Sequence, residues 1–287
     1  MAFAALGTDR AASLVFLGGV SANSPIRRQA DLAARFYGLE MTEVNGQSAV
    51  AAVRRRETVA VIVAAEALTT IDRRKLFSSL ARRGKQVPLL IGADGREFGS
   101  LSNWSGGAVT GCEAGAGGTA NWNLRVHPSE IARQLSGAIL GFEGSVACVL
   151  RLAARGSTRV LVDAFQQGEA FPLFVRAEYQ GYAVFVAAGM HATGTDSGLM
   201  EAFSSMLPVM AFLRYAAGEQ AWHAAGHYAN LTVDDPWLCE KYGHLDYRAL
   251  SLEMAKHRFH TTIAFVPWNF DRSRREIVNL CADRFRP

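Results

Sequence analysis

The chain has 287 residues, of which 49% are hydrophobic, so it can bury a substantial core in one large domain or two modest ones. Its net charge of +4 is small and its arginines are mixed with acidic residues, which argues against nucleic acid as a partner. No apolar run reaches the roughly 18 residues that span a bilayer, so we expect no membrane-embedded segment.

The sequence contains four widely spaced cysteines: Cys112, Cys148, Cys239 and Cys281. None of them forms a C-x-x-C pair, so the spacing predicts isolated, reduced thiols in a cytoplasmic protein, with neither a disulfide framework nor a zinc knuckle. The apolar segment 11–20 could belong to a secretory leader, but Asp9 and Arg10 precede it where a clearly positive region is expected. A first strand over this segment is the favoured interpretation.

The first part of the chain alternates between short apolar runs and amphipathic segments. We expect four strands there, at residues 13–17, 41–44, 58–65 and 87–91. Pro25 begins a helix after the first strand, and Thr70 is a candidate cap for a helix over residues 71–83, with Phe77 and Leu80 facing inward. This alternation predicts an α/β fold with a doubly wound, mostly parallel sheet.

Residues 92–118 are rich in glycine and small polar side chains, which predicts a long surface loop. Within it, the small residues around Cys112 suit a nucleophile on a strand-to-helix turn, and class I glutamine amidotransferases place a cysteine on such a turn. No helical pattern follows Gly115, so an incidental cysteine is the favoured interpretation. The run 115–118 lacks the full phosphate-binding fingerprint, which favours a flexible loop.

The next segment is expected to complete the first domain. Pro128 begins a predicted helix, and further elements are expected at residues 158–162, 173–179 and 182–188 (strands) and 199–217 (a helix). The link Gln180-Gly181 is so short that the strands on either side of it must form an antiparallel hairpin. This order of elements resembles the amidotransferase-like and flavodoxin-like α/β domains, and we assign residues 1–222 to such a domain.

Two histidines lie at the expected joint between domains. His223 and His227 are four residues apart, a spacing that can chelate a metal from one helix face. Gly226 lies between them and no carboxylate accompanies them, so linker histidines are the favoured interpretation.

The segment 228–237 is an alternating strand pattern that ends in two adjacent carboxylates, Asp234 and Asp235. Pro236 ends the strand, because proline has no N–H to donate to a neighbouring strand. Neighbouring carboxylates repel each other unless a proton or a cation lies between them, and a metal-assisted hydrolase uses this arrangement. A turn in which an aspartate caps a backbone amide is the alternative.

Two stretches within residues 231–269 resemble the polysaccharide deacetylase family of NodB-like, metal-dependent hydrolases. Leu231-Thr232-Val233-Asp234-Asp235 resembles the first motif of the family, a hydrophobic strand ending T-F-D-D, and residues 259–269 resemble its second strand. The resemblance implies that Asp234 is a general base, that Asp235 binds a divalent metal, with zinc as the first candidate, and that the substrate is a carbohydrate or another N-acetylated small molecule. The family completes its site with an H-x-x-x-H motif on the next strand, and this sequence ends at Pro287 before such a strand.

Four further residues are candidates for the same site. His244, in the loop after the aspartates, is the one histidine placed to help Asp235 hold the metal. Trp237, Trp268 and Asn269 lie at predicted strand ends, where they could line a sugar-binding surface or serve as packing residues.

Residues 223–287 are therefore predicted to be the N-terminal part of a deacetylase-type domain, with the first βα units of an incomplete barrel. A closed βα barrel needs roughly 200 residues, so we expect this part to be unstable alone or to form homo-oligomers. Two alternatives stay open: a non-catalytic assembly or ligand-binding α/β protein, and a cysteine enzyme that uses Cys112.

Overall fold

The computed structural model describes most of the chain, namely residues 12–18, 24–81, 87–93, 98–114, 120–154, 158–166, 168–192, 199–222, 231–234, 237–239, 245–264 and 273–284. The chain divides into two units, Met1–His223 and Ala224–Pro287, each with its own hydrophobic core. We call them the large unit and the small unit.

The large unit contains the following strands: β1 Ser13–Leu17, β2 Glu40–Val44, β3 Thr58–Ala64, β4 Leu89–Ala93, β5 Val109–Ala114, β6 Ala120–Val126, β7 Ile139–Val146, β8 Cys148–Leu152, β9 Arg159–Gln166, β10 Glu169–Tyr179, β11 Tyr182–Ala188 and β12 Met190–Ala192. Its helices are α1 Pro25–Phe36, α2 Ala49–Val53, α3 Arg73–Ala81, α4 Phe98–Trp104 and α5 Leu199–Ala217, with 3-10 turns at Ala65–Ala67, Arg133–Leu135 and Gly218–Gln220.

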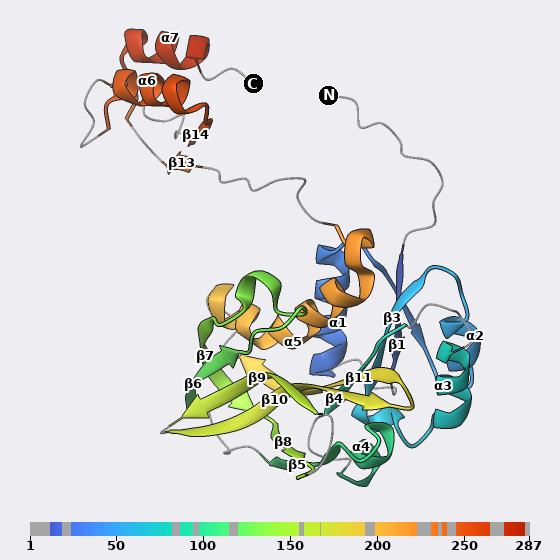
Figure 1. Cartoon of the computed structure of the whole chain (residues 1–287). Coiled ribbons are helices and arrows are strands. Elements are labelled where there is room, and N and C mark those ends of the chain that lie inside the picture. Colours follow the sequence, from blue (N-terminus) through green and yellow to red (C-terminus); the bar gives the residue numbers. More distant parts are fainter. Residues whose placement is uncertain are drawn as a thin grey trace. The chain divides into compact units, whose positions relative to one another are not determined.

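Ten of the described strands of the large unit form a mixed sheet in the order β12-β7-β6-β9-β10-β11-β4-β3-β1-β2, and β5 and β8 form a separate two-stranded sheet. Strands β2, β1, β3, β4 and β11 run parallel to one another, and the remaining neighbours in this sheet pair antiparallel. Helices α1 and α5 pack together on one face of the parallel strands, and α2 and α3 cover the other face (Figure 1). The predicted α/β fold is therefore confirmed, with a parallel core, but the sheet is mixed rather than mostly parallel, because strands β6, β7, β9, β10 and β12 add antiparallel pairs.

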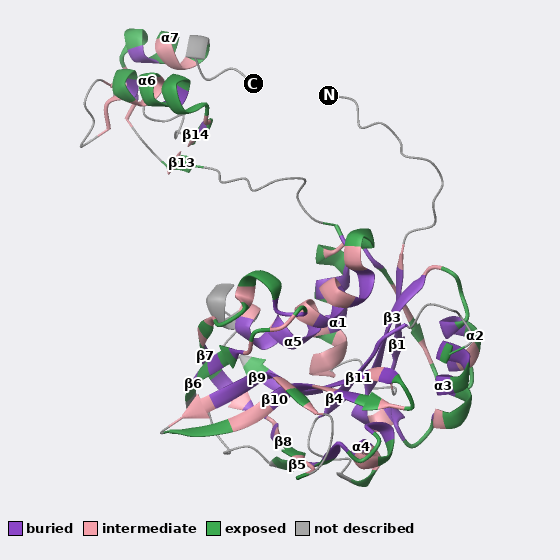
Figure 2. Ribbon diagram, viewed as in Figure 1, coloured by how far each residue is buried: buried purple, intermediate pink, exposed green. Residues whose placement is uncertain are grey.

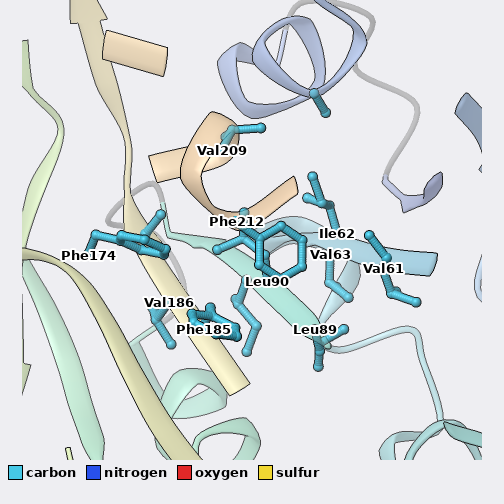
Figure 3. Packing of buried hydrophobic residues seen from close by; sticks show 14 of the residues in the cluster. Val61, Ile62, Val63, Leu89, Leu90, Phe174, Phe185, Val186, Val209 and Phe212 are labelled. Atoms are coloured by element: carbon cyan, nitrogen blue, oxygen red, sulfur yellow. The ribbon is translucent and has the colours of Figure 1, made fainter. Parts of the chain in front are cut away.

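The parallel strands form because their residues are apolar throughout. All residues of β1, β3 and β4 are buried, as expected for strands that helices cover on both faces (Figure 2). Phe212 of α5 packs edge-on against Phe185 of β11, with ring centroids 5.3 Å apart, and Ile62 and Leu90 of the neighbouring strands complete this part of the core (Figure 3). The helix and the sheet thus share one continuous apolar interior.

The predicted hairpin between β10 and β11 is also confirmed. The two strands pair antiparallel from Phe174↔Ala187 to Tyr179↔Tyr182. Gln180 and Gly181 have φ angles of +50° and +80°, which a two-residue turn of the type that matches strand twist requires.

Three sequence-based expectations for the large unit are wrong. The segment after Pro128 forms only a 3-10 turn before β7, and the expected loop over residues 92–118 contains α4 and β5. Helix α3 begins after Asp72, whose Oδ1 accepts a hydrogen bond from the backbone N–H of Lys75 at 3.1 Å. Thr70 instead donates its hydroxyl to the carbonyl of Ala67, so it does not cap the helix.

The expectation that all four cysteines are isolated thiols is wrong as well. Cys112 on β5 and Cys148 on β8 form a disulfide, with their Cα atoms 5.5 Å apart, whereas Cys239 and Cys281 are free. Sequence spacing did not reveal the pair, because it is the antiparallel pairing of β5 with β8 that brings the two residues together. Reduced cysteines were the reason for expecting a cytoplasmic protein, and this reason no longer holds.

The small unit alternates strand and helix: β13 Leu231–Asp234, α6 Tyr247–His257, β14 Thr261–Ala264 and α7 Arg275–Arg284. Strands β13 and β14 pair parallel, and Asp246 caps α6 by accepting hydrogen bonds from the N–H groups of Arg248 and Ala249 at 2.9 and 3.0 Å. The described residues of this unit form a two-stranded sheet with two helices, and no barrel.

Candidate functional site

Asp234 is the one predicted catalytic residue that lies within the described structure. It is the last residue of β13 and is exposed, and its partner in register is Ala264, the last residue of β14. The carboxyl ends of parallel strands, together with the loops that follow them, are where βα folds place their reactive groups. The carboxylate thus lies at the strand end that the sequence pattern predicts, although Leu231, at the start of the same strand, is 50% exposed.

The other predicted site residues are not brought together in the described structure. Asp235, His244, Trp268 and Asn269 lie outside the described residues. Trp237 is half-buried. Among the described residues, no three side chains of the kinds that bind metals lie close together.

Tyr247 is a positioning residue that the sequence suggested only as part of a packing face. Its side chain is fully buried, and its hydroxyl donates a hydrogen bond to the carbonyl of Trp237 at 3.1 Å. Burial, together with the nearby thiols of Cys281 and Cys239, raises the pKa of Tyr247 to about 12, so the hydroxyl stays protonated as a donor at neutral pH. Tyr247, the first residue of α6, thereby fixes the position of Trp237, which follows the two aspartates in the sequence.

Replacing Tyr247 with phenylalanine is expected to destabilise the small unit by about 1 kcal/mol, because the part-buried hydrogen bond from the tyrosine hydroxyl to the carbonyl of Trp237 is lost. Hydrogen exchange of the α6 amides, measured by mass spectrometry on the full chain, should then accelerate about fivefold. Leu252→Ala is the matched control, since Leu252 is on the same helix and is 70% exposed. Equal exchange in the wild type and in the tyrosine variant would contradict this role.

A second candidate site is a cavity in the large unit at the carboxyl ends of the parallel strands. It has a volume of about 230 Å³. Its lining comes from the segments after β1 and β3, from the last residues of β4 and β11, and from three residues in or beside β12 and β7. These residues are Ser24, Pro25, Ile26, Glu66, Gly92, Ala93, Ala187, Ala188, Gly189, His191 and Ala147. In open α/β sheets the ligand generally binds at this edge, where the connections from neighbouring strands diverge.

Backbone hydrogen bonds hold the wall of this cavity together. The N–H of Gly189 donates to the carbonyl of Ala93 at 2.7 Å, and the N–H of Ala147 donates to the carbonyl of Gly189 at 2.8 Å. The sulfur of Cys148 lies 3.7 Å from the same carbonyl of Ala93, so the disulfide lies directly behind the wall. The parallel and antiparallel halves of the sheet are joined at this point.

The position of Cys112 removes it as a candidate nucleophile. It lies within β5, is 1% exposed and is bonded to Cys148, so it has no thiolate to offer. The hypothesis of a cysteine enzyme using Cys112 is therefore wrong.

A third candidate site is a cluster of polar side chains on the antiparallel half of the sheet. Asp163 of β9 accepts two hydrogen bonds from Arg125, at 3.1 and 2.7 Å, and contacts Nε2 of His127 at 2.9 Å. Burial alone would raise the pKa of Asp163, but the hydrogen bonds from Arg125 and His127 outweigh it and leave the pKa below its usual value. These three residues do not line the cavity described above, and their geometry indicates a structural role.

Comparison with known proteins finds likeness only among solved structures, since no protein-family model and no curated protein matches the sequence. A ThuA-like protein from Bacteroides uniformis is 9% identical, with a TM-score of 0.50, over 76% of this chain and 96% of its own. PurLQS from Thermotoga maritima is 13% identical, with a TM-score of 0.48, over 71% of this chain and 98% of its own. A protein described as a GMP synthase component from Thermoplasma acidophilum is 8% identical, with a TM-score of 0.45, over 72% of this chain and 96% of its own.

At these identities the likeness concerns the fold alone, and it gives no evidence for the deacetylase family. The described helices include none that is long and apolar enough to cross a membrane. The chain is thus similar in fold to a ThuA-like α/β protein.

Proposed function

We propose that the small unit carries part of a metal-dependent hydrolase site of the polysaccharide deacetylase type, which acts on the C–N bonds of N-acetyl or other amide groups. The observation that carries the proposal is the position of Asp234, an exposed carboxylate at the carboxyl end of a strand in a parallel βαβ unit. The resemblance of Leu231-Thr232-Val233-Asp234-Asp235 to the first motif of the family supports the same assignment. A carbohydrate or another N-acetylated small molecule is the proposed substrate.

In this proposal each residue has a defined task. Asp235 and His244 would hold a divalent ion, with zinc as the first candidate, and such an ion polarises an amide carbonyl and acidifies a water molecule. Asp234 would take the proton of that water, a task that suits a solvent-accessible carboxylate. Trp237 and Trp268, with Asn269, would contact the sugar ring.

Metal content is the property to test, because two protein ligands do not make a complete zinc site and no H-x-x-x-H motif follows the two aspartates in this sequence. With free zinc kept in the gel-filtration buffer, the wild-type chain is expected to carry about one zinc ion per chain above the buffer level, since two ligands bind the ion too weakly to hold it after free zinc is removed. Asp235→Ala should lose it, whereas Asp234→Asn should retain it, because the proposed role of Asp234 is to move a proton. The measurement is mass spectrometry of the metal in protein fractions from gel filtration.

Glu253→Gln is the matched control, since Glu253 is an exposed carboxylate on α6 that pairs with Lys256 and His257. Circular dichroism should show that each variant keeps its helices. A folded wild-type chain without zinc, or equal zinc in the wild type and Asp235→Ala, would refute the hydrolase proposal.

The small unit also offers a basis for self-association. Leu231, Leu252 and Val278 are large apolar side chains of this unit that are 50%, 70% and 40% exposed. Exposed apolar surface of this kind supports the proposed formation of homo-oligomers.

A second candidate function is a non-catalytic, ligand-binding role for the large unit. The cavity at the carboxyl ends of its parallel strands favours this role, because it lies where α/β folds bind ligands.

A further inference from the structure

We propose that the cavity of the large unit binds a small organic amine, whose ammonium group donates hydrogen bonds to the carboxylate of Glu66. The proposal rests on the second candidate function and names its ligand class. It is independent of the metal site proposed for the small unit.

The size of the cavity limits the ligand to a small molecule. Its volume of about 230 Å³ equals that of roughly eight water molecules in the liquid. A nucleotide or an oligosaccharide needs more space than this, since pockets for drug-sized ligands have volumes of about 300–1,000 Å³. A single compact metabolite matches the available space.

Most of the lining offers apolar contact and few free polar groups. The wall consists mainly of small residues: Gly92, Ala93, Ala147, Ala187, Ala188 and Gly189. The carbonyls of Ala93 and Gly189 already accept hydrogen bonds from within the wall. Specific recognition of a polar ligand must therefore come mainly from the polar side chains that line the cavity.

Three polar side chains are available: Ser24, Glu66 and His191. Ser24 precedes α1, and its hydroxyl makes no capping hydrogen bond to that helix. His191 is exposed on β12. Both side chains can donate a hydrogen bond to, or accept one from, a second polar group of the ligand. Glu66 is the carboxylate among the three, so it favours a ligand with a positive charge.

Glu66 combines two properties, since it is partly buried in the lining of the cavity and it has no ion pair among the described residues. Glu43 pairs with Arg27, Glu130 pairs with Arg159 and Arg176, and Asp163 pairs with Arg125. Glu66, in contrast, is half-buried beside small apolar residues and forms no ion pair within the described part of the chain. A partly desolvated carboxylate is stabilised by a hydrogen-bonded cation, and an ammonium group of a ligand supplies both the charge and the donors.

The test uses matched probes on the full chain after treatment with EDTA, so that no metal site contributes. Benzylamine and benzyl alcohol have nearly the same size and shape, and n-butylamine and n-butanol form a second such pair. Titration followed by ligand-observed NMR should show that each amine binds at least about tenfold more tightly than its alcohol. Glu66→Gln should weaken amine binding about tenfold or more and leave alcohol binding unchanged.

Glu178→Gln is the control, because Glu178 is an exposed carboxylate on β10 outside the cavity, and it should leave both probes unaffected. Equal binding of amine and alcohol, or unchanged amine binding in Glu66→Gln, would overturn the amine assignment while the cavity would stand as a binding site. Absence of binding by all four probes at millimolar concentration would overturn both this inference and the ligand-binding role. Neither result bears on zinc binding by Asp235.

Discussion

Replacing Asp163 with alanine is expected to lower the free energy of unfolding of the large unit by about 3 kcal/mol, the lower end of the range for breaking a buried charge pair. The side chain of Asp163 is 7% exposed, and it joins β9 to the neighbouring strand β6 through Arg125 and His127. Removal of the carboxylate leaves the guanidinium of Arg125 without its bidentate partner. The lower end applies because Arg125 is 46% exposed, so water molecules can replace part of its hydrogen bonds to the lost carboxylate.

Urea unfolding of the full chain, followed by tryptophan fluorescence, measures this loss. Glu130→Ala is the control, because Glu130 is 50% exposed and its pairs with Arg159 and Arg176 should contribute less than about 1 kcal/mol. Similar losses in the two variants would show that the burial of Asp163 adds nothing to its ion pairs.

The dependence of this effect on pH follows from the direction of the pKa shift. The pKa of Asp163 is lower in the folded protein than its ordinary value, so its stabilising contribution is fully present above the pKa of the unfolded chain, about 3.9. The contribution is lost as the pH falls through the folded pKa. The difference between the wild type and Asp163→Ala should therefore be constant near neutrality and shrink below about pH 4. A difference that grew in acid would contradict the assignment.

The parallel half of the sheet could be predicted because its local and global signals agree. Strands β1, β3 and β4 are short apolar runs without alternation, which fits strands that are covered on both faces. Pro25 marks the start of α1, where its missing N–H costs nothing. The residues of these elements are sufficient to predict them, because no second apolar pattern competes with the first.

The antiparallel half was harder to predict because two periods compete in it. The apolar residues Ile131, Leu135 and Ile139 happen to recur at helical spacing, yet Ile139 begins β7 and is 61% exposed. A correct signal was present just before them in β6, where Trp122 and Leu124 are buried and alternate with exposed residues. The pairing of β6 with β7 and β9 shows that this part of the chain adopts the strand pattern.

The candidate sites show the same division between local and distant information. Asp234 could be placed at a strand end because the alternating pattern and Pro236 lie beside it in sequence. The cavity that Glu66 lines could not be predicted from the sequence, because its lining comes from the ends of four parallel strands and from the antiparallel half of the sheet. Likewise, the partners of Asp163 are 36 and 38 residues away, and only the pairing of β6 with β9 brings them together.

The disulfide should have an effect of similar size to that of Asp163. Replacing both Cys112 and Cys148 with alanine is expected to lower the free energy of unfolding of the large unit by about 3–4 kcal/mol, because a bond that closes a loop of 36 residues restricts the unfolded chain. Urea unfolding of the double variant, compared with the wild type under non-reducing conditions, measures the change. The control is Cys239→Ala, which removes a free thiol of the small unit and should leave the large unit unaffected.

Thiol counting gives an independent check of the same bond. Alkylation of the denatured, unreduced chain should label Cys239 and Cys281 only, and labelling of four cysteines would refute the disulfide. In the folded chain both bonded cysteines are at most 1% exposed, so a reductant should act only after local opening of β5 and β8. Because the sulfur of Cys148 lies behind Ala93 in the cavity wall, the double variant should also loosen this wall and weaken amine binding, even though it leaves Glu66 in place.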